Sequence, residues 1–358
     1  MRTARLPRFR RSTDPSAPTK PRRWRRFFAI VAATSGVVAL LAVVVQFGLP
    51  GSWGDRDHLR AFESDQGRQT YQVHLPPGYT DTEQLPVMMA IHGCVMTGFG
   101  YNSMKDATQF NTLADEDRFI VVYPTQTVFA NKINCWNSIE PAHQLRGTGE
   151  PALLAGVAQQ VIDEFNADPN QIHVSGASSG AGTAVILGAT YPDIFASVTS
   201  VAGGEYALNQ VNADAPQDLP PQSTGKQAWA QMGTHARPVP LLVVQGDADD
   251  VVPTLVADRL VEQWATVSDL ATDGVLNGDV DDVADDVTEY SPAGLHAYTQ
   301  TTYNDADGNP LIESYLVKGQ AHAWSGPDGS GWFTDQAGPD LATLSWDFAQ
   351  AHPMEDQE

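Results

Sequence analysis

Residues 174–182 read V-S-G-A-S-S-G-A-G, and this stretch decides the fold and the chemistry that the sequence predicts. It contains the pattern G-x-S-x-G centred on Ser178. The apolar residues before it predict a strand over 172–175, and the small residues after it predict a helix over 181–190. A tight strand-to-helix turn admits only small residues two positions before and after its serine, and it lifts the hydroxyl clear of the sheet. Ser178 is therefore a candidate nucleophile.

Segments typical of strands and helices alternate on both sides of this turn. Strands are expected from apolar runs and helices from apolar residues that recur every three or four positions. The expected strands span 71–75, 86–91, 119–123, 172–175, 240–244, 298–303 and 311–317, with a hairpin turn between the last two. The expected helices span 151–165, 181–190, a segment capped by Thr254, and a closing segment over 341–348. This alternation predicts an α/β domain with a mainly parallel central sheet flanked by helices.

A candidate acid and a candidate base follow Ser178 in the chain. The carboxylates lie in Q-G-D-A-D-D-V-V-P, residues 245–253, directly after a predicted strand. The base is His322 in the glycine-rich loop G-Q-A-H-A-W-S-G, residues 319–326. Catalysis by a serine needs a histidine that takes its proton and a carboxylate that orients the imidazole. The chain order Ser, Asp, His is that of α/β-hydrolases, although spacing alone leaves three aspartates open as the acid.

The same fold predicts where an oxyanion would be held. One donor is the backbone N–H of the residue after the nucleophile, here Ser179, and a second comes from the loop after an early strand. That loop begins His92, Gly93, Cys94, so Cys94 supplies the second candidate N–H. A simple strand-ending turn is the alternative interpretation of His92-Gly93.

Six ordered blocks between about Arg68 and His352 resemble the polyhydroxybutyrate depolymerase family of serine esterases, which is related to feruloyl and acetylxylan esterases. The blocks are L-P-V-M-M-A-I-H-G-C, N-C-W-N, P-A-H-Q-L-R-G-T-G-E-P-A-L, V-S-G-A-S-S-G, V-V-Q-G-D-A-D-D-V-V-P and G-Q-A-H-A-W-S-G. In the family the acid is the Asp after Ala, which falls on Asp249 here. Members usually carry Leu and Ala on either side of the serine, where this chain has Ala177 and Ser179.

The resemblance implies ester hydrolysis without a metal or organic cofactor, on short-chain polyhydroxyalkanoates such as poly-3-hydroxybutyrate or their oligomers. Feruloyl or acetylated plant-polysaccharide esters are the alternative substrates. Because the sequence stops at Glu358, soon after His322, without the extra substrate-binding domain of secreted polymer degraders, we expect oligomers or small esters rather than solid polymer. A peptidase on the same fold and a surface binding protein with an inactive site are the rival functions.

Two further pairs of residues take roles from this resemblance. Cys94 and Cys135 match the positions of the family's disulfide, with two free buried thiols as the alternative. Trp136 and Trp324 flank the second cysteine and the candidate base, and we expect them to line the ester-binding cleft rather than only the core.

The charge of −22 is divided between two parts of the sequence. Residues 1–26 carry ten Lys and Arg and one acid, whereas the remaining 332 residues carry 11 basic and 42 acidic groups. Residues 27–49 lack charge and are long enough to cross a bilayer of about 30 Å, with arginines directly before them. We expect an uncleaved membrane anchor, with a cleaved secretory signal as the alternative; both place the rest outside the cytoplasm. Residues 27–358 are so acidic that they would repel phosphate backbones, which argues against nucleic acid as a binding partner.

The expected organisation is a basic cytoplasmic tail (1–26), an anchor (27–49), a tether (50–66), a catalytic domain (67–352) and a short tail (353–358). Residues 268–289 contain eight acids, which we interpret as a solvated loop because the spacing lacks the pattern of a calcium loop. The sequence does not indicate an oligomeric state.

Overall fold

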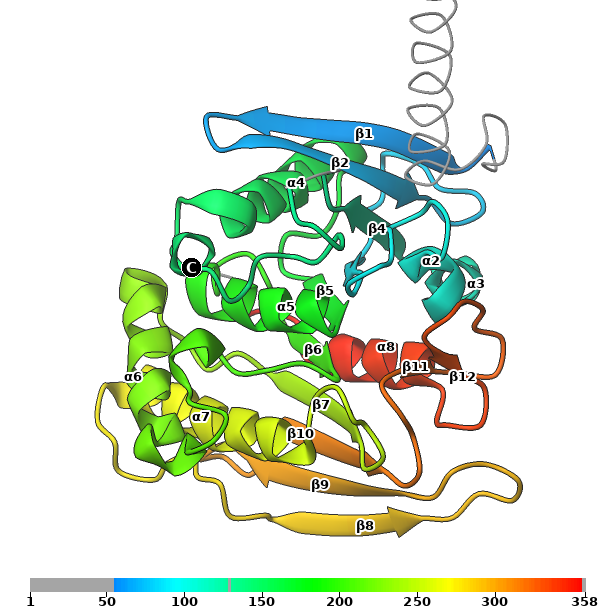
Figure 1. Cartoon of the computed structure of the whole chain (residues 1–358). Coiled ribbons are helices and arrows are strands. Elements are labelled where there is room, and N and C mark those ends of the chain that lie inside the picture. The colour runs from blue at the N-terminus through cyan, green and yellow to red at the C-terminus, as the bar shows by residue number, and fades with distance from the viewer. Residues whose placement is uncertain (1–54, 128–129, 356–358) are drawn as a thin grey trace, which may run out of the picture. The chain divides into compact units, whose positions relative to one another are not determined.

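The computed structural model describes residues 55–127 and 130–355, which build one ten-stranded sheet with helices against it (Figure 1). The order of strands across the sheet is β1-β2-β4-β3-β5-β6-β7-β10-β9-β8. Their bounds are β1 Asp57–Ser64, β2 Gly67–His74, β3 Val87–Ile91, β4 Ile120–Thr125, β5 Ile172–Ala177, β6 Val198–Val201, β7 Leu241–Gly246, β8 Asp286–Tyr290, β9 Tyr298–Asn304 and β10 Pro310–Val317. A separate two-stranded sheet joins β11 Trp324–Ser325 to β12 Thr334–Asp335.

The centre of the large sheet is parallel and its margins are antiparallel. Strands β4, β3, β5, β6, β7 and β10 pair in parallel with one another. Strands β1 and β2 continue the sheet antiparallel on one side, and β9 and β8 do so on the other. The α/β class with a mainly parallel central sheet is thereby confirmed. In parallel sheets the carboxyl ends of the strands share one edge, so the loops that leave these strands meet there.

Two helical layers cover the two faces of the sheet. The helices are α2 Met104–Thr108, α3 Phe110–Asp117, α4 Gly149–Phe165, α5 Ser179–Thr190, α6 Pro221–Met232, α7 Thr254–Asp273 and α8 Leu341–Ala351. Within β3, Met89 belongs to a buried cluster with apolar residues of α4, α5, α6 and α7, whereas Met88 belongs to a second cluster with residues of α2, α3 and α8. Because successive strand residues point to opposite faces, the uninterrupted apolar sequence of β3 reflects burial on both sides.

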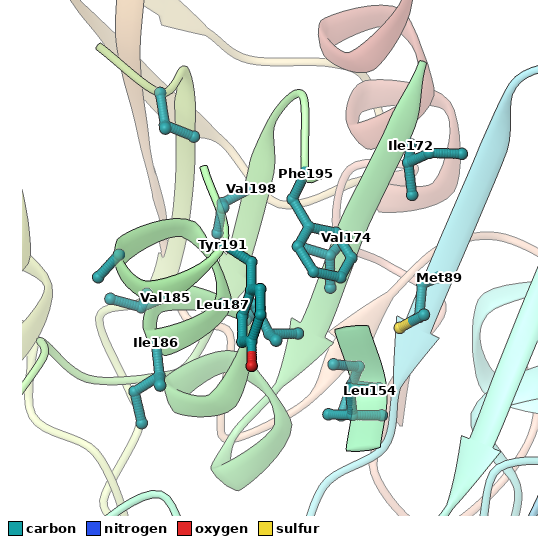
Figure 2. Close-up of a cluster of buried hydrophobic side chains, with 14 of the residues drawn as sticks. Met89, Leu154, Ile172, Val174, Val185, Ile186, Leu187, Tyr191, Phe195 and Val198 are labelled. Atoms are coloured by element: carbon teal, nitrogen blue, oxygen red, sulfur yellow. The ribbon is translucent and has the colours of Figure 1, made fainter. Parts of the chain in front are cut away.

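Figure 2 shows the first of these clusters around the strand and helix that carry the candidate nucleophile. Ile172 and Val174 from β5, Val185 and Leu187 from α5, and Leu154 from α4 all belong to this cluster. Side chains of this size each contribute about 1.5–3 kcal/mol on full burial. This packing anchors the strand before Ser178 and the helix after it to the same core.

Part of the stretch expected to be a tether is a strand. Residues Asp57–Ser64 form β1, which pairs with all of β2 from Asp57 opposite His74 to Ser64 opposite Gly67. The sequence D-H-L-R-A-F-E-S lacks an apolar run because none of the residues of this edge strand is fully buried. The described domain therefore begins before residue 67.

The expectation of a solvated acidic loop over 268–289 holds for most of its acids and fails at its two ends. The exposed acids are Asp273, Asp281, Asp282, Asp285, Asp286 and Glu289. Helix α7 extends to Asp273, and β8 occupies Asp286–Tyr290. Asp269 is buried, and its carboxylate accepts backbone N–H bonds from Asn277, Gly278 and Val280, with N–O distances of 2.9–3.2 Å. A carboxylate expected to be hydrated thus fixes the chain that leaves α7. A smaller correction concerns the same helix, because its N-cap is Pro253 and Thr254 is its first residue.

The expected anchor at 27–49 lies outside the described residues, as does the basic segment before it. Among residues 55–127 and 130–355, every helix is too short or too polar to cross a lipid bilayer.

Candidate active site

Ser178 occupies the strained turn between β5 and α5. Its backbone has φ 55° and ψ −118°, a combination that residues other than glycine rarely adopt. The glycines on either side of Ser178 leave no room for a side chain. A Cβ atom on Gly176 would lie 2.2 Å from the carbonyl oxygen of Gly180, and one on Gly180 would lie 2.3 Å from the carbonyl oxygen of Ile91. The sequence predicted small residues at these two positions, and the structure shows the atoms that exclude larger ones.

The candidate acid and base are joined at the edge of the sheet where Ser178 lies. His322 follows β10 and Asp249 follows β7, and the His322 Nδ1 lies 2.7 Å from Asp249 Oδ2. The Asp249 carboxylate is fully buried, whereas the imidazole is 15% exposed. Of the three aspartates that spacing left open, Asp247 and Asp250 are exposed, and only Asp249 contacts the histidine.

The surroundings of Asp249 keep it ionised. Burial acts to raise the pKa of this carboxyl group. Hydrogen bonds from the backbone N–H groups of Val252 and Val251, both at 2.8 Å, and the contact with His322 outweigh burial and hold the pKa below its usual value. An ionised Asp249 accepts a hydrogen bond from the Nδ1–H of His322, so the unprotonated Nε2 can accept a proton.

Ser178 and His322 line the same cavity of about 270 Å³. Within residues 55–127 and 130–355, no direct hydrogen bond joins the Ser178 hydroxyl to the imidazole. Catalytic hydrogen bonds of this type are often long in the absence of substrate and shorten when substrate binds.

The loop after β3 packs against the serine turn. A Cβ atom on Gly93 would lie 3.3 Å from both the Ala177 carbonyl oxygen and Ser178 Cβ, so only a very small residue allows this approach. The fully buried His92 holds the loop, since its Nδ1 lies 2.7 Å from the Gly93 carbonyl oxygen and its Nε2 accepts the Gln126 backbone N–H at 3.0 Å. Burial lowers the pKa of His92 to about 4, so it is neutral and donates from Nδ1.

A disulfide joins Cys94 to Cys135, with their Cα atoms 4.1 Å apart, as the resemblance implies. It ties the loop after β3 to the segment that carries Trp136. The Trp136 backbone N–H in turn donates to Ser179 Oγ at 3.3 Å. Both backbone segments that carry the candidate oxyanion donors are therefore connected to the same piece of chain.

Sequence reasoning missed the group that holds this piece of chain. This group is Glu150, which lies in the first turn of α4, where a helix favours a negative charge. Its buried carboxylate accepts bonds from Gln126 Nε2, the Asn137 backbone N–H and Asn137 Nδ2 at 2.6–2.7 Å. Gln126 also donates to the Cys135 carbonyl oxygen. The sequence gives no local signal for this network, because Asn137 lies 13 residues and Gln126 lies 24 residues before Glu150 in the chain.

A second cavity of about 370 Å³ meets the first at Ser178. Trp324 lines the first cavity and Trp136 lines the second, each with 2% of its surface exposed. Trp324 also packs edge-to-face on Phe110, and Trp136 lies against His92. Each tryptophan thus borders a cavity and belongs to the core. No cluster of three or more metal-binding side chains occurs in the described part of the chain.

The sequence profile of the family described as Esterase PHB depolymerase matches residues 69–280. The chain belongs to this family. The suspected family is thereby confirmed, and the match covers the serine turn, the loop after β3 and Asp249.

Individual relatives agree with this assignment. The chain is 28% identical over 310 residues to poly(3-hydroxyalkanoate) depolymerase C of Paucimonas lemoignei, an alignment that covers 84% of this chain and 66% of the relative. It is 26% identical to feruloyl esterase B of Neurospora crassa, covering 66% of this chain and 77% of that protein. The acetyl xylan esterase from Aspergillus awamori has a similar fold, with a TM-score of 0.60 at 21% identity, covering 74% of this chain and 94% of that structure. The chain thus spans about two thirds of the length of the depolymerase it matches, and these relatives are carboxylic ester hydrolases by name.

Proposed function

We propose that this protein is a serine esterase that hydrolyses carboxylic esters through Ser178, His322 and Asp249. The observation that carries the proposal is the 2.7 Å contact between His322 and the buried Asp249, at the edge of the cavity that Ser178 borders. Membership of an esterase family supports the same reaction.

The reaction proceeds in two halves. Ser178 Oγ attacks the ester carbonyl carbon while its proton passes to His322 Nε2, and Asp249 stabilises the imidazolium. The bond between the carbonyl carbon and the alcohol oxygen then breaks, and His322 gives the proton to the departing alcohol. A water molecule next attacks the acyl–Ser178 ester, with His322 as base, and releases the acid.

The backbone N–H groups of Cys94 and Ser179 donate hydrogen bonds to the negatively charged carbonyl oxygen of the intermediate. Ser179 is the first residue of α5, and the first N–H groups of a helix have no acceptor inside the helix. Such prearranged donors contribute about 3 to 4 kcal/mol each to the stabilisation of an oxyanion. The disulfide at Cys94 and the Trp136–Ser179 contact support this role because they restrain both donors.

For the substrate, we favour a short-chain polyhydroxyalkanoate, such as poly-3-hydroxybutyrate, or its oligomers. The support is the relative that is named a poly(3-hydroxyalkanoate) depolymerase and covers 84% of this chain. Trp136 and Trp324 are proposed to contact the ester from the two cavities they border. A feruloyl or acetylxylan type of ester is the alternative, supported by the feruloyl esterase relative.

We place the catalytic domain outside the cytoplasm, attached to a membrane through residues 27–49 or released if that segment is cleaved. The uncharged 23-residue segment after a cluster of arginines supports this location. The Cys94–Cys135 disulfide supports it as well, because disulfides persist in oxidising compartments.

The test is hydrolysis of p-nitrophenyl butyrate by the full chain in detergent. Ser178→Ala is expected to lose activity by about 10⁶-fold, as seen when a catalytic serine is removed. Ser330→Ala is the control, since Ser330 is exposed and borders neither cavity at Ser178, and we expect a loss of less than about twofold. Retained activity in Ser178→Ala would disprove the proposal.

A panel of esters then decides the substrate class. Hydroxybutyrate trimers, polymer film, methyl ferulate and acetylxylan are compared by kcat/KM. The trimers are expected to be the best substrates, and a higher kcat/KM for the feruloyl or acetyl esters would make the alternative the correct class.

A further inference from the structure

Two cavities open on either side of Ser178, and they share only a few residues. Cys94, Ser178, Ala202 and Val251 border both. His322 borders the first cavity and is absent from the second. The candidate base therefore distinguishes the two sides of the nucleophile.

Apart from these shared residues, the two cavities are bordered by different side chains, although the segment around Cys135 contributes to both. The first cavity is bordered by residues after β3 and after β10, including Met96, Trp324 and Phe333. The second is bordered by the segment after Cys135, the loop after β6 and the start of α7, including Ser138, Gly204 and Val256. A substitution on one side can thus leave the other lining unchanged.

The chemistry of the reaction decides which part of an ester fits each side. In the tetrahedral intermediate, the carbon carries Ser178 Oγ, the oxyanion, the alcohol oxygen and the acyl chain. His322 takes the proton from Ser178 Oγ and gives it to the alcohol oxygen, so both oxygens lie within hydrogen-bond reach of one imidazole nitrogen. The oxyanion is directed to the backbone donors. The remaining substituent, the acyl chain, therefore points away from His322.

From this geometry we infer that the second cavity receives the acyl chain and the first receives the alcohol. The inference rests on the proposed esterase function and adds to it the residues that set specificity. Ile139 and Val256, which border only the second cavity, limit acyl length. Ile133, which borders only the first, limits the length of the alcohol.

Ile133 and Ile139 form a matched pair for the test. Both are isoleucines of the segment around the disulfide, and they are 58% and 57% exposed, so a larger side chain at either position leaves the core intact. Each borders a different cavity. Ile133→Trp and Ile139→Trp therefore introduce the same bulk on opposite sides of Ser178.

Two ester series measure the two sides separately in the full chain. The acyl series is methyl acetate, methyl butyrate and methyl hexanoate, and the alcohol series is methyl, butyl and hexyl acetate. Ile139→Trp is expected to lower the kcat/KM ratio of methyl hexanoate to methyl acetate about tenfold, and to change the ratio of hexyl to methyl acetate less than about twofold. Ile133→Trp is expected to do the reverse.

Two adjacent residues of α7 separate the effect of a blocked cavity from the effect of adding a large side chain nearby. Val256 borders the second cavity, whereas Leu255 is 48% exposed and borders neither. Val256→Trp is expected to shorten the preferred acyl chain, and Leu255→Trp to alter neither ratio.

The inference is overturned if Ile139→Trp changes the alcohol series and Ile133→Trp the acyl series. It is also overturned if the acyl ratio is unaltered in both Ile139→Trp and Val256→Trp. These outcomes differ from a failure of the proposed function, in which the unmodified protein would hydrolyse no ester in either series.

Discussion

A Cβ atom on Gly180 would lie 2.3 Å from the carbonyl oxygen of Ile91. Gly180 lies in the first turn of α5, and Ile91 is the last residue of β3. The helix that follows the nucleophile thus touches the end of the strand that leads into the oxyanion loop. This contact is between backbone atoms, so no flexible side chain can move to relieve it. It therefore fixes the position of Ser178, just before α5, relative to Cys94, just after β3.

Gly180→Ala is predicted to destabilise the fold and the site together. The added methyl group meets the carbonyl oxygens of Ile91 and His92 at 2.3 and 2.5 Å, so β3 and α5 must separate. We expect a loss of about 3 kcal/mol or more, as for overpacked cores. Gly182→Ala is the control, since its methyl group meets only the Ser138 side chain at 3.1 Å, and Gly-to-Ala changes within helices are favourable by about 1 kcal/mol. Urea unfolding of both variants measures this, and equal stability would contradict the steric argument.

Asp249→Asn is predicted to lower kcat by about 10⁴-fold while the protein stays folded. The amide keeps the shape of the carboxylate, but it cannot stabilise the imidazolium and favours the wrong tautomer of His322. Asp250→Asn is the matched control, because its side chain is exposed in the same loop. Steady-state hydrolysis of p-nitrophenyl butyrate distinguishes the two variants. A similar kcat for both would show that Asp249 does not orient His322.

Removal of the disulfide is predicted to cost stability and activity. The bond between Cys94 and Cys135 closes a loop with a sequence separation of 41 residues, which corresponds to about 4 kcal/mol in the chain-entropy treatment. Cys94→Ser combined with Cys135→Ser is expected to lose about this free energy of unfolding, and the freed loop is expected to lower kcat. Dithiothreitol should lower the Tm of the original protein and leave that of the double variant unchanged. A Tm that does not respond to either treatment would contradict the prediction.

The free energy of unfolding is predicted to fall as the pH drops below about 6.5. Burial lowers the pKa of His92 to about 4 and that of His173 to about 3, so both are neutral in the folded protein throughout this range. In the unfolded chain each binds a proton below about pH 6.5, so the unfolded state gains protons that the folded state lacks, and acid favours it. Each histidine contributes about 1.4 kcal/mol per pH unit between pH 6 and its folded pKa, and nothing above pH 7.

His173→Gln provides the measurement for this pH effect. Urea unfolding at pH 7.5, 6.0 and 5.0 gives the slope of stability against pH. The variant is expected to have a slope smaller by about 1.4 kcal/mol per pH unit than the original protein between pH 6 and 5. An identical slope in both proteins would mean that His173 does not resist protonation in the fold.

The local sequence was informative at the serine turn and at the longer buried strands, whereas the short buried strand β6, V-T-S-V, was missed because two of its four residues are polar. Strands buried on both faces, such as β3 and β4, leave continuous apolar runs, and the serine turn needs glycines at fixed spacing. Edge strand β1 was missed because its exposed side chains carry no such pattern. Helix α6 was missed for a similar reason, since P-Q-S-T-G-K-Q-A-W-A-Q-M has few apolar residues and a glycine in its interior.

The sequence by itself indicated the α/β class, the family, the serine turn and the order of the candidate triad, because each shows as a local motif or as the order of such motifs along the chain. Only the tertiary structure decided what depends on distant segments. It brought Asp249, which the family resemblance had already indicated as the acid, into contact with His322, and it joined Glu150 to Gln126 and Asn137. It also placed two cavities around Ser178. The physical reason is that hydrogen bonds and cavities form between strand ends that meet at one edge of the sheet, and no local pattern records which loops will meet there.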